Sequence, residues 1–254
     1  MRALIVALLA AAPAFSQVAA PAPATTPAPP AAAPVGWQAN FDTLWKQRDA
    51  PGIIAQLHQI VEAQLAVDKR SFDANWRLAS LYNWEANQTD GDKKAGLGHK
   101  GWEAADIAIE VKPNDVHSQY FSATGLGLYA EGVGILTALQ QGLEGKFRER
   151  IGAALKLDKE FQDGAPQVVW GRFFFKLPWP KRDDNESIRI LTPLLETHPN
   201  NLRAKLYLAD SLTDEGSAED ARKLVQQILD APPGEDPPET RLLQTQARKW
   251  MASH

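Results

Sequence analysis

The chain has 254 residues, a formal net charge of −4 and no cysteine. Without cysteine, disulfides, thiolate metal sites and cysteine nucleophiles are excluded. The chain also lacks the clustered lysines and arginines that contact phosphates, so no nucleic-acid partner is expected. The length suits one elongated helical domain or a single globular one.

The first residues have the order of a secretory signal. A basic residue precedes an apolar run from Ala3 to Ala12, and small residues follow that run. This order predicts a signal peptide over residues 1–16, with cleavage after Ser16 or, alternatively, after Ala14. The run is shorter than the roughly 20 residues of a membrane span, although a retained anchor stays open. Because no cysteine can be lipidated, we expect an exported, soluble periplasmic protein.

Residues 17–36 are almost entirely Ala, Pro and Thr, which predicts an extended, disordered linker without a packed core. A helical domain is expected over residues 37–254. Its first hairpin is indicated by apolar residues at helical spacing, with Pro51 in the first turn of the second helix. The two apolar stripes are Trp37, Phe41, Leu44 and Trp45, then Ile53, Ile54, Leu57, Ile60, Val61 and Leu65.

A repeat pattern is clearest near the C-terminus. A 34-residue frame that begins at Leu202 places apolar and small residues as in the tetratricopeptide repeat, two antiparallel helices closed by a proline. The residues in this frame are Leu208, Ala209, Leu212, Gly216, Ala221, Val225, Ile228 and Pro233. The small residues Ala209 and Ala221 are expected to let the two helices pack closely.

Three earlier units follow the same frame, and two of them carry an insertion between their helices. The expected N-caps of the earliest are Ser71 or Asp73. A last helix is expected to cover the open end of the array. The insertions are Asn87 to Lys100 and Tyr129 to Leu143, the fourth unit is Asp163 to Pro199, and the last helix is Pro237 to Trp250, with Leu242, Leu243, Ala247 and Trp250 buried.

The predicted fold class is therefore all-α: a tetratricopeptide-like α-solenoid of four to five helical hairpins with a C-terminal capping helix. The first helices of the units are expected to line a concave groove, because neighbouring hairpins of such arrays bury each other.

Patterns that could carry catalysis or cofactor binding have structural explanations. The run Gly125 to Ala130 has the spacing of a dinucleotide fingerprint, but that fingerprint needs a preceding strand, whereas a helix is expected here. We interpret the run as a place where two helices approach closely or a helix bends. The five histidines form no ligand pair at helical spacing, so neither a metal nor a cofactor is expected. Of the carboxylates, Asp184 is expected, with Asn185 as the alternative, to cap the helix near Glu186.

Aromatic residues are more numerous than repeat packing needs, and aromatic anchors commonly dominate binding in grooves. Arg172 and Lys176, four residues apart, would share one helical face, where they either pair with a neighbouring unit or meet an anionic group. No nucleophile, base and oxyanion set can be assembled, so no catalytic residue is predicted. The residues predicted to bind a partner or ligand are Trp76, Tyr82, Tyr120, Tyr129, Trp170, Arg172 and Lys176.

One stretch resembles a known family. It runs Asp163-Gly164-Ala165-Pro166, then Trp170-Gly171-Arg172, Phe174, Lys176-Leu177-Pro178-Trp179-Pro180 and Asp184-Asn185, and it is similar to the TRAP-transporter T-component (TatT) family. The upstream residues Tyr120, Ala123, Gly127 to Ala130 and Leu157-Asp158 fit the same pattern, so the resemblance covers roughly Phe72 to Leu229.

The resemblance implies an extracytoplasmic helical scaffold that associates with the solute-binding protein of a TRAP transport system, with a cavity for a small apolar ligand. We therefore expect a non-enzymatic periplasmic scaffold that binds a partner protein as an accessory to solute uptake. The alternatives are a carrier of a small apolar ligand, enclosed by the insertion between Gly125 and Leu143, and a general periplasmic peptide- or protein-binding adaptor. Homo-oligomer formation stays open.

Overall fold

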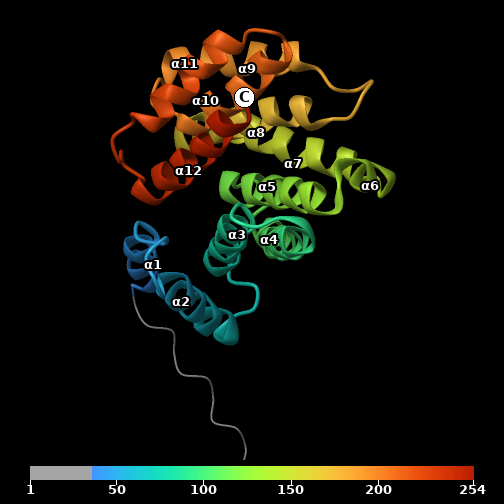
Figure 1. Cartoon of the computed structure of the whole chain (residues 1–254). Coiled ribbons are helices and arrows are strands. Elements are labelled where there is room, and N and C mark those ends of the chain that lie inside the picture. Colours follow the sequence, from blue (N-terminus) through green and yellow to red (C-terminus); the bar gives the residue numbers. More distant parts are fainter. Residues whose placement is uncertain (1–35) are drawn as a thin grey trace, which may run out of the picture. The chain divides into compact units, whose positions relative to one another are not determined.

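The computed structural model describes residues 36–254, so the predicted signal peptide and nearly all of the predicted linker lie outside the described residues. Within this range the chain forms helices and no strands, which confirms the predicted all-α helical-repeat solenoid (Figure 1). The helices are α1 Trp37–Trp45, α2 Ile53–Val67, α3 Phe72–Ala86, α4 Gly91–Val111, α5 Val116–Val133, α6 Ile135–Gln140, α7 Leu143–Leu157, α8 Phe161–Lys176, α9 Asp184–Thr197, α10 Leu202–Asp214, α11 Ala218–Leu229 and α12 Pro237–Ser253.

Helices that follow one another pack as hairpins. The pairs are α1 with α2, α3 with α4, α5 with α7, α8 with α9, and α10 with α11, while α12 packs on α10 and α11. The predicted small residues Ala209 and Ala221 are fully buried and share a core cluster with Val225 and with Trp250 of α12. The close packing of the last hairpin and the covering helix are thus both confirmed.

Glycines set the distance between α4 and α5. A Cβ atom on Gly125 would lie 2.6 Å from the backbone nitrogen of Trp102, and one on Gly98 would lie 2.5 Å from that of Tyr129. Carbon and nitrogen atoms cannot approach so closely without a shift of the backbone, so only glycine fits. The expectation that the run beginning at Gly125 marks a close helix approach is confirmed.

The two predicted insertions lie between the two helices of their units and are largely helical, the second one including the short helix α6. Residues 91–100 form the first part of α4, and residues 129–133 extend α5. The two extensions support each other, because Ala95 packs against Gly132 and the Lys94 ammonium lies 3.2 Å from a Glu131 carboxylate oxygen. A lone hairpin would leave such added turns without a partner, whereas here each extension packs on the other.

Helix ends differ from the sequence expectations by one or two residues. Ser71 caps α3 as expected, since its hydroxyl accepts the backbone N–H of Ala74. The cap of α9 is Asp183 and not Asp184, because the Asp183 carboxylate accepts the Glu186 N–H at 2.9 Å. Pro51 precedes α2, which begins at Ile53.

None of the helices described here is both long enough and apolar enough to cross a membrane.

Candidate functional site

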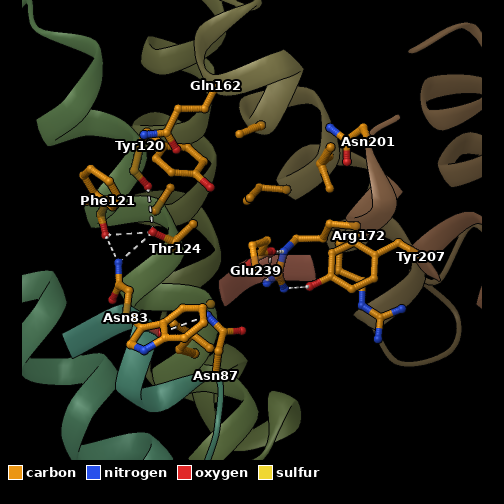
Figure 2. Close-up of a pocket in the computed structure, with 18 of the residues that line it drawn as sticks. Asn83, Asn87, Tyr120, Phe121, Thr124, Gln162, Arg172, Asn201, Tyr207 and Glu239 are labelled. Atoms are coloured by element: carbon orange, nitrogen blue, oxygen red, sulfur yellow. Dashed lines mark hydrogen bonds and ion pairs between the residues drawn. The ribbon is translucent and has the colours of Figure 1, made fainter. Parts of the chain in front are cut away.

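A pocket of about 1290 Å³ lies between the first helices of the hairpins. Its lining comes from α1, α3, α5, α8, α10 and α12, with contributions from α6, from the start of α7 and from the connections before α10 and α12. Figure 2 shows Tyr120, Phe121 and Thr124 on one side of this space and Arg172 and Tyr207 on the other. The predicted groove on the first-helix faces is therefore confirmed.

Aromatic side chains make up much of the pocket wall. Trp76 of α3 stacks on Phe121 of α5 with ring centroids 5.9 Å apart, and Phe147 of α7 stacks on Phe173 of α8 at 4.8 Å. These rings both join neighbouring hairpins and present faces to the pocket. The aromatic residues of the lining are Phe41, Trp45, Trp76, Trp84, Tyr120, Phe121, Phe147, Phe173 and Tyr207.

Four of the seven predicted binding residues line the pocket. They are Trp76, Tyr120, Arg172 and Lys176. Because they come from α3, α5 and α8, the structure brings together residues that are up to 100 positions apart in sequence. Their part in binding stays a prediction.

The other three predicted residues lie outside the pocket lining and pack between helices. Tyr82 faces a smaller hollow between α2, α3 and α4. The Tyr129 ring lies against Trp102 of α4, and its hydroxyl donates to Gln141 at 3.1 Å. Trp170 packs on Phe173 and Phe174, with Arg148 of α7 over its ring. All three are on first helices, as expected, but on sides that turn away from the pocket.

Arg172 is paired with a neighbouring unit. One of its guanidinium nitrogens donates to Asp210 of α10 at 2.5 Å, and the same cation lies over the ring of Tyr207 at 4.2 Å. The other Asp210 oxygen accepts the indole N–H of Trp250 in α12 at 2.9 Å. Of the two alternatives for Arg172, the structure therefore shows the salt bridge.

Lys176 is also paired, with Glu131 of α5. Its ammonium lies 3.2 Å from one oxygen of that carboxylate, while Lys94 lies at the same distance from the other oxygen. Burial raises the pKa of Glu131, but the attraction of Lys176 and Lys94 outweighs burial and leaves the pKa below its usual range. The pocket thus contains an ionised carboxylate held between two cations.

Tyr120 of α5 is in contact with two phenylalanine rings at the pocket wall. Its ring meets those of Phe121 and Phe161 edge to face, with centroids 5.1 and 5.4 Å away. Burial raises the pKa of its hydroxyl, so the group is neutral at physiological pH and can serve as a hydrogen-bond donor.

Two polar features of the pocket were missed by sequence reasoning. The first is Asn83, whose side-chain amide donates to the Phe121 carbonyl at 3.0 Å and to the Thr124 hydroxyl at 2.8 Å. This amide joins α3 to α5 at the pocket wall. An isolated asparagine inside a predicted helix carries no signal that could have identified this role.

The second missed feature is a left-handed segment near the start of α8. Gln162, Asp163 and Gly164 have φ of 47°, 57° and 81°, and the first two line the pocket. L-residues with side chains seldom adopt such angles, and asparagine, aspartate and glycine tolerate them best. The Asn201 side chain holds the segment by donating to the Asp163 carbonyl at 2.9 Å. The Asp163-Gly164 pair was a usable signal for a turn here.

The pocket combines apolar faces with charged side chains. Its aromatic faces suit apolar groups, and four of its cations, Arg48, Arg172, Lys176 and Arg203, each have a carboxylate partner. In residues 36–254, no group of three or more His, Cys, Asp or Glu side chains could hold a metal ion.

Comparison with known proteins places the C-terminal part of the chain in a repeat class. The tetratricopeptide repeat family model matches residues 185–247, from α9 into α12. No curated protein matches the chain. The fold and this match together define a tetratricopeptide-like helical-repeat protein. Repeats of this class generally mediate protein–protein interactions and typically form scaffolds without catalytic activity.

Proposed function

We propose that this protein is an exported, non-enzymatic scaffold that receives a segment of a partner protein in its pocket, as the accessory component of a TRAP-type solute uptake system. The observation that carries the proposal is the aromatic pocket on the first-helix faces, in which Trp76 and Phe121 stack across two hairpins. Rigid aromatic faces in a concave surface are the usual anchors for a partner.

The transport role rests on the resemblance of the Asp163 to Asn185 stretch to the T-component family. This stretch forms most of the pocket-lining helix α8, the connection that follows it and the first two residues of α9. Trp179 on that connection is 89 % exposed, which is unusual for so large an apolar side chain. We infer that this tryptophan is a second contact point for the partner.

A second candidate function is carriage of a small apolar ligand. The pocket has a volume of about 1290 Å³, which is more than the roughly 300–1,000 Å³ of ordinary small-molecule sites, so a ligand of ordinary size has room in it. An aromatic wall with a neutral hydroxyl at Tyr120 suits a mainly apolar molecule with one polar group. Native mass spectrometry of protein purified without detergent tests this candidate, because a carrier retains its ligand.

Site-specific photocrosslinking in intact source cells tests the partner proposal. A photoreactive phenylalanine is placed singly at Trp76, at Trp179 or at Tyr82. Trp76 and Tyr82 both lie on α3, but only Trp76 lines the pocket, so Tyr82 is the matched control. We expect positions 76 and 179 to capture a solute-binding protein or a transporter subunit, and position 82 to capture neither.

Other patterns of capture decide between the alternatives. Capture from position 179 alone would place the partner outside the pocket and leave the pocket to a small ligand. Capture of unrelated periplasmic proteins from position 76 would overturn the transport role and favour a general adaptor. If neither position captures a protein in a strain that expresses the transporter, the partner proposal is wrong.

A further inference from the structure

Charged side chains join the first hairpin to the last helix. Arg48 and Asp49 follow α1, and Asp236, Glu239 and Arg241 lie at the start of α12, about 190 positions later in the chain. The Arg48 guanidinium donates to Asp236 at 2.7 Å and lies 3.9 Å from Glu239. Arg241 makes a two-point contact with Asp49 at 2.5 and 2.9 Å.

This junction is ionic, whereas the helices on each side of it are anchored by apolar clusters. Phe41 of α1 belongs to a cluster with α2 and α3, and Leu243 of α12 belongs to another with α10 and α11. No apolar cluster among residues 36–254 contains side chains from both α1 and α12. Ion pairs that reach solvent weaken with salt, whereas apolar contacts do not. Asp236 and Arg241 are 47 % and 54 % exposed, so salt can screen both pairs from that side, while the Arg48 side chain itself is buried.

Each half of the junction is held in place by its own neighbours. The Arg48 guanidinium lies over the rings of Trp45 and Trp84, at 4.5 and 4.1 Å, and also donates to the Trp45 carbonyl. Asp236 caps α12 by accepting the Glu239 N–H at 3.1 Å. Arg48 and Asp236 thus each keep contacts that do not involve the other. The junction can therefore separate and rejoin without local refolding.

The junction is also part of the pocket wall, since Arg48, Asp236 and Glu239 all line the pocket. Separation of α1 from α12 would open that wall along its side. We propose that the Arg48–Asp236 and Asp49–Arg241 pairs form an electrostatic latch, and that release of this latch is the route by which a large ligand or peptide segment enters the pocket. The latch does not depend on which molecule the pocket takes.

Pulsed electron paramagnetic resonance between two spin labels tests the latch. The native chain has no cysteine, so Gln47→Cys with Thr245→Cys gives a unique label pair across the junction at exposed positions. Glu103→Cys with Glu149→Cys, on α4 and α7, gives a control pair within the array. Release of the latch is expected to lengthen the distance between labels 47 and 245 and to leave the distance between labels 103 and 149 unchanged.

The releasing variant is Asp49→Asn with Asp236→Asn. Both changes remove charge at constant size, and asparagine still caps α12. In this variant we expect the ratio of open to closed molecules to rise about tenfold. The labelled protein with its native latch residues should show a similar rise in about 1 M salt. Asp49→Arg alone should lengthen the distance between labels 47 and 245, and adding Arg241→Asp should restore the closed distance, because opposite charges then face each other again.

Two further measurements make the test decisive. Glu110→Gln breaks an exposed ion pair with Arg70 that lies away from the junction, so the distance between labels 47 and 245 should not change. A thiol introduced as Ser80→Cys in the pocket wall should react faster with a bulky polyethylene-glycol maleimide when the latch is released. An unchanged distance distribution in the Asp49→Asn, Asp236→Asn variant and in high salt, with the control pair intact, would overturn the proposal.

Discussion

Single glycines in this protein differ sharply in what surrounds them. Gly125 of α5 lies against the backbone of Trp102 in α4, and a Cβ atom there would be 2.6 Å from a backbone nitrogen. Gly152 of α7 has nothing within 4 Å of the place where its Cβ would lie. Both are in helices, so helix propensity alone would treat them alike.

We therefore predict opposite effects for the same substitution at these two positions. Gly125→Ala should lower the free energy of unfolding by about 1–3 kcal/mol, because the backbone of α4 must move to admit the methyl group. Gly152→Ala should raise it by about 0.5–1 kcal/mol, because alanine loses less conformational entropy on folding. Urea unfolding followed by circular dichroism measures both. Equal effects would show that α4 and α5 are not in backbone contact.

At the scale of elements, one carboxylate joins three helices. Glu131 of α5 holds Lys94 of α4 and Lys176 of α8, and both cations lie 3.2 Å away. Burial by itself would raise the pKa of Glu131, yet the two lysines lower it below the value of 4.5 expected in an unfolded chain. Folding thus favours the ionised form of Glu131. This side chain stabilises the folded protein only at pH values at which its carboxylate is charged.

The pH dependence of this contribution has a definite sign. Stability from Glu131 should be fully present above about pH 4.5 and be lost as the pH falls through the lowered folded-state pKa. Glu131→Gln should therefore lower the free energy of unfolding by about 1–3 kcal/mol at pH 7 and by much less near pH 3. Denaturant unfolding across this range measures the difference.

Glu149→Gln on α7 is the control for that prediction. Its side chain is 68 % exposed and forms an ion pair with the neighbouring Arg150. The difference in the free energy of unfolding between this variant and the native protein should stay near zero at every pH. If Glu131→Gln shows the same flat profile, the carboxylate does not bridge the three helices.

At the scale of the whole molecule, the repeat array depends on α12. This helix covers the apolar face of α10 and α11 with Leu243, Ala247 and Trp250, each buried. It also supplies Asp236 and Arg241 to the junction with the first hairpin. Arrays of this kind need a terminal unit that shields the last repeat from water.

A chain that ends at Pro233 should accordingly lose its defined fold. We expect aggregation or a large loss of helix signal, since the last hairpin would expose Ala221, Val225 and Ile228. A chain that ends at Met251 removes only exposed residues and should stay folded and monodisperse. Size-exclusion chromatography and circular dichroism compare the two. A monodisperse, fully helical chain ending at Pro233 would show that α12 is dispensable.

Much of the fold was predictable because it depends on local periodicity. The spacing of Leu208, Ala209, Ala221 and Ile228 identifies a hairpin without any knowledge of its neighbours, and the C-terminal helix follows from the same kind of pattern. The pocket wall was predictable to the extent that first helices of repeats face inward. Trp76 and Tyr120 were found for this reason.

Other features depended on which residues face each other in space. Tyr82 and Tyr129 lie on first helices but turn away from the pocket, because the side on which a residue lies depends on helix rotation and on the partner helix. The helical extensions at Lys94–Ala95 and Glu131–Gly132 pack against each other across the two insertions, a contact that the sequence pattern does not indicate. The junction of Arg48 and Asp49 with α12 joins residues about 190 positions apart, and no periodicity links them.

The sequence by itself thus determined the repeat helices, their pairing into hairpins and the aromatic character of the groove, since these follow from residue type and spacing along one chain segment. Only the tertiary structure decided which side chains line the pocket, which ion pairs form and where the first hairpin meets the last helix. Those depend on the angle between successive hairpins, which is the summed result of many side-chain contacts.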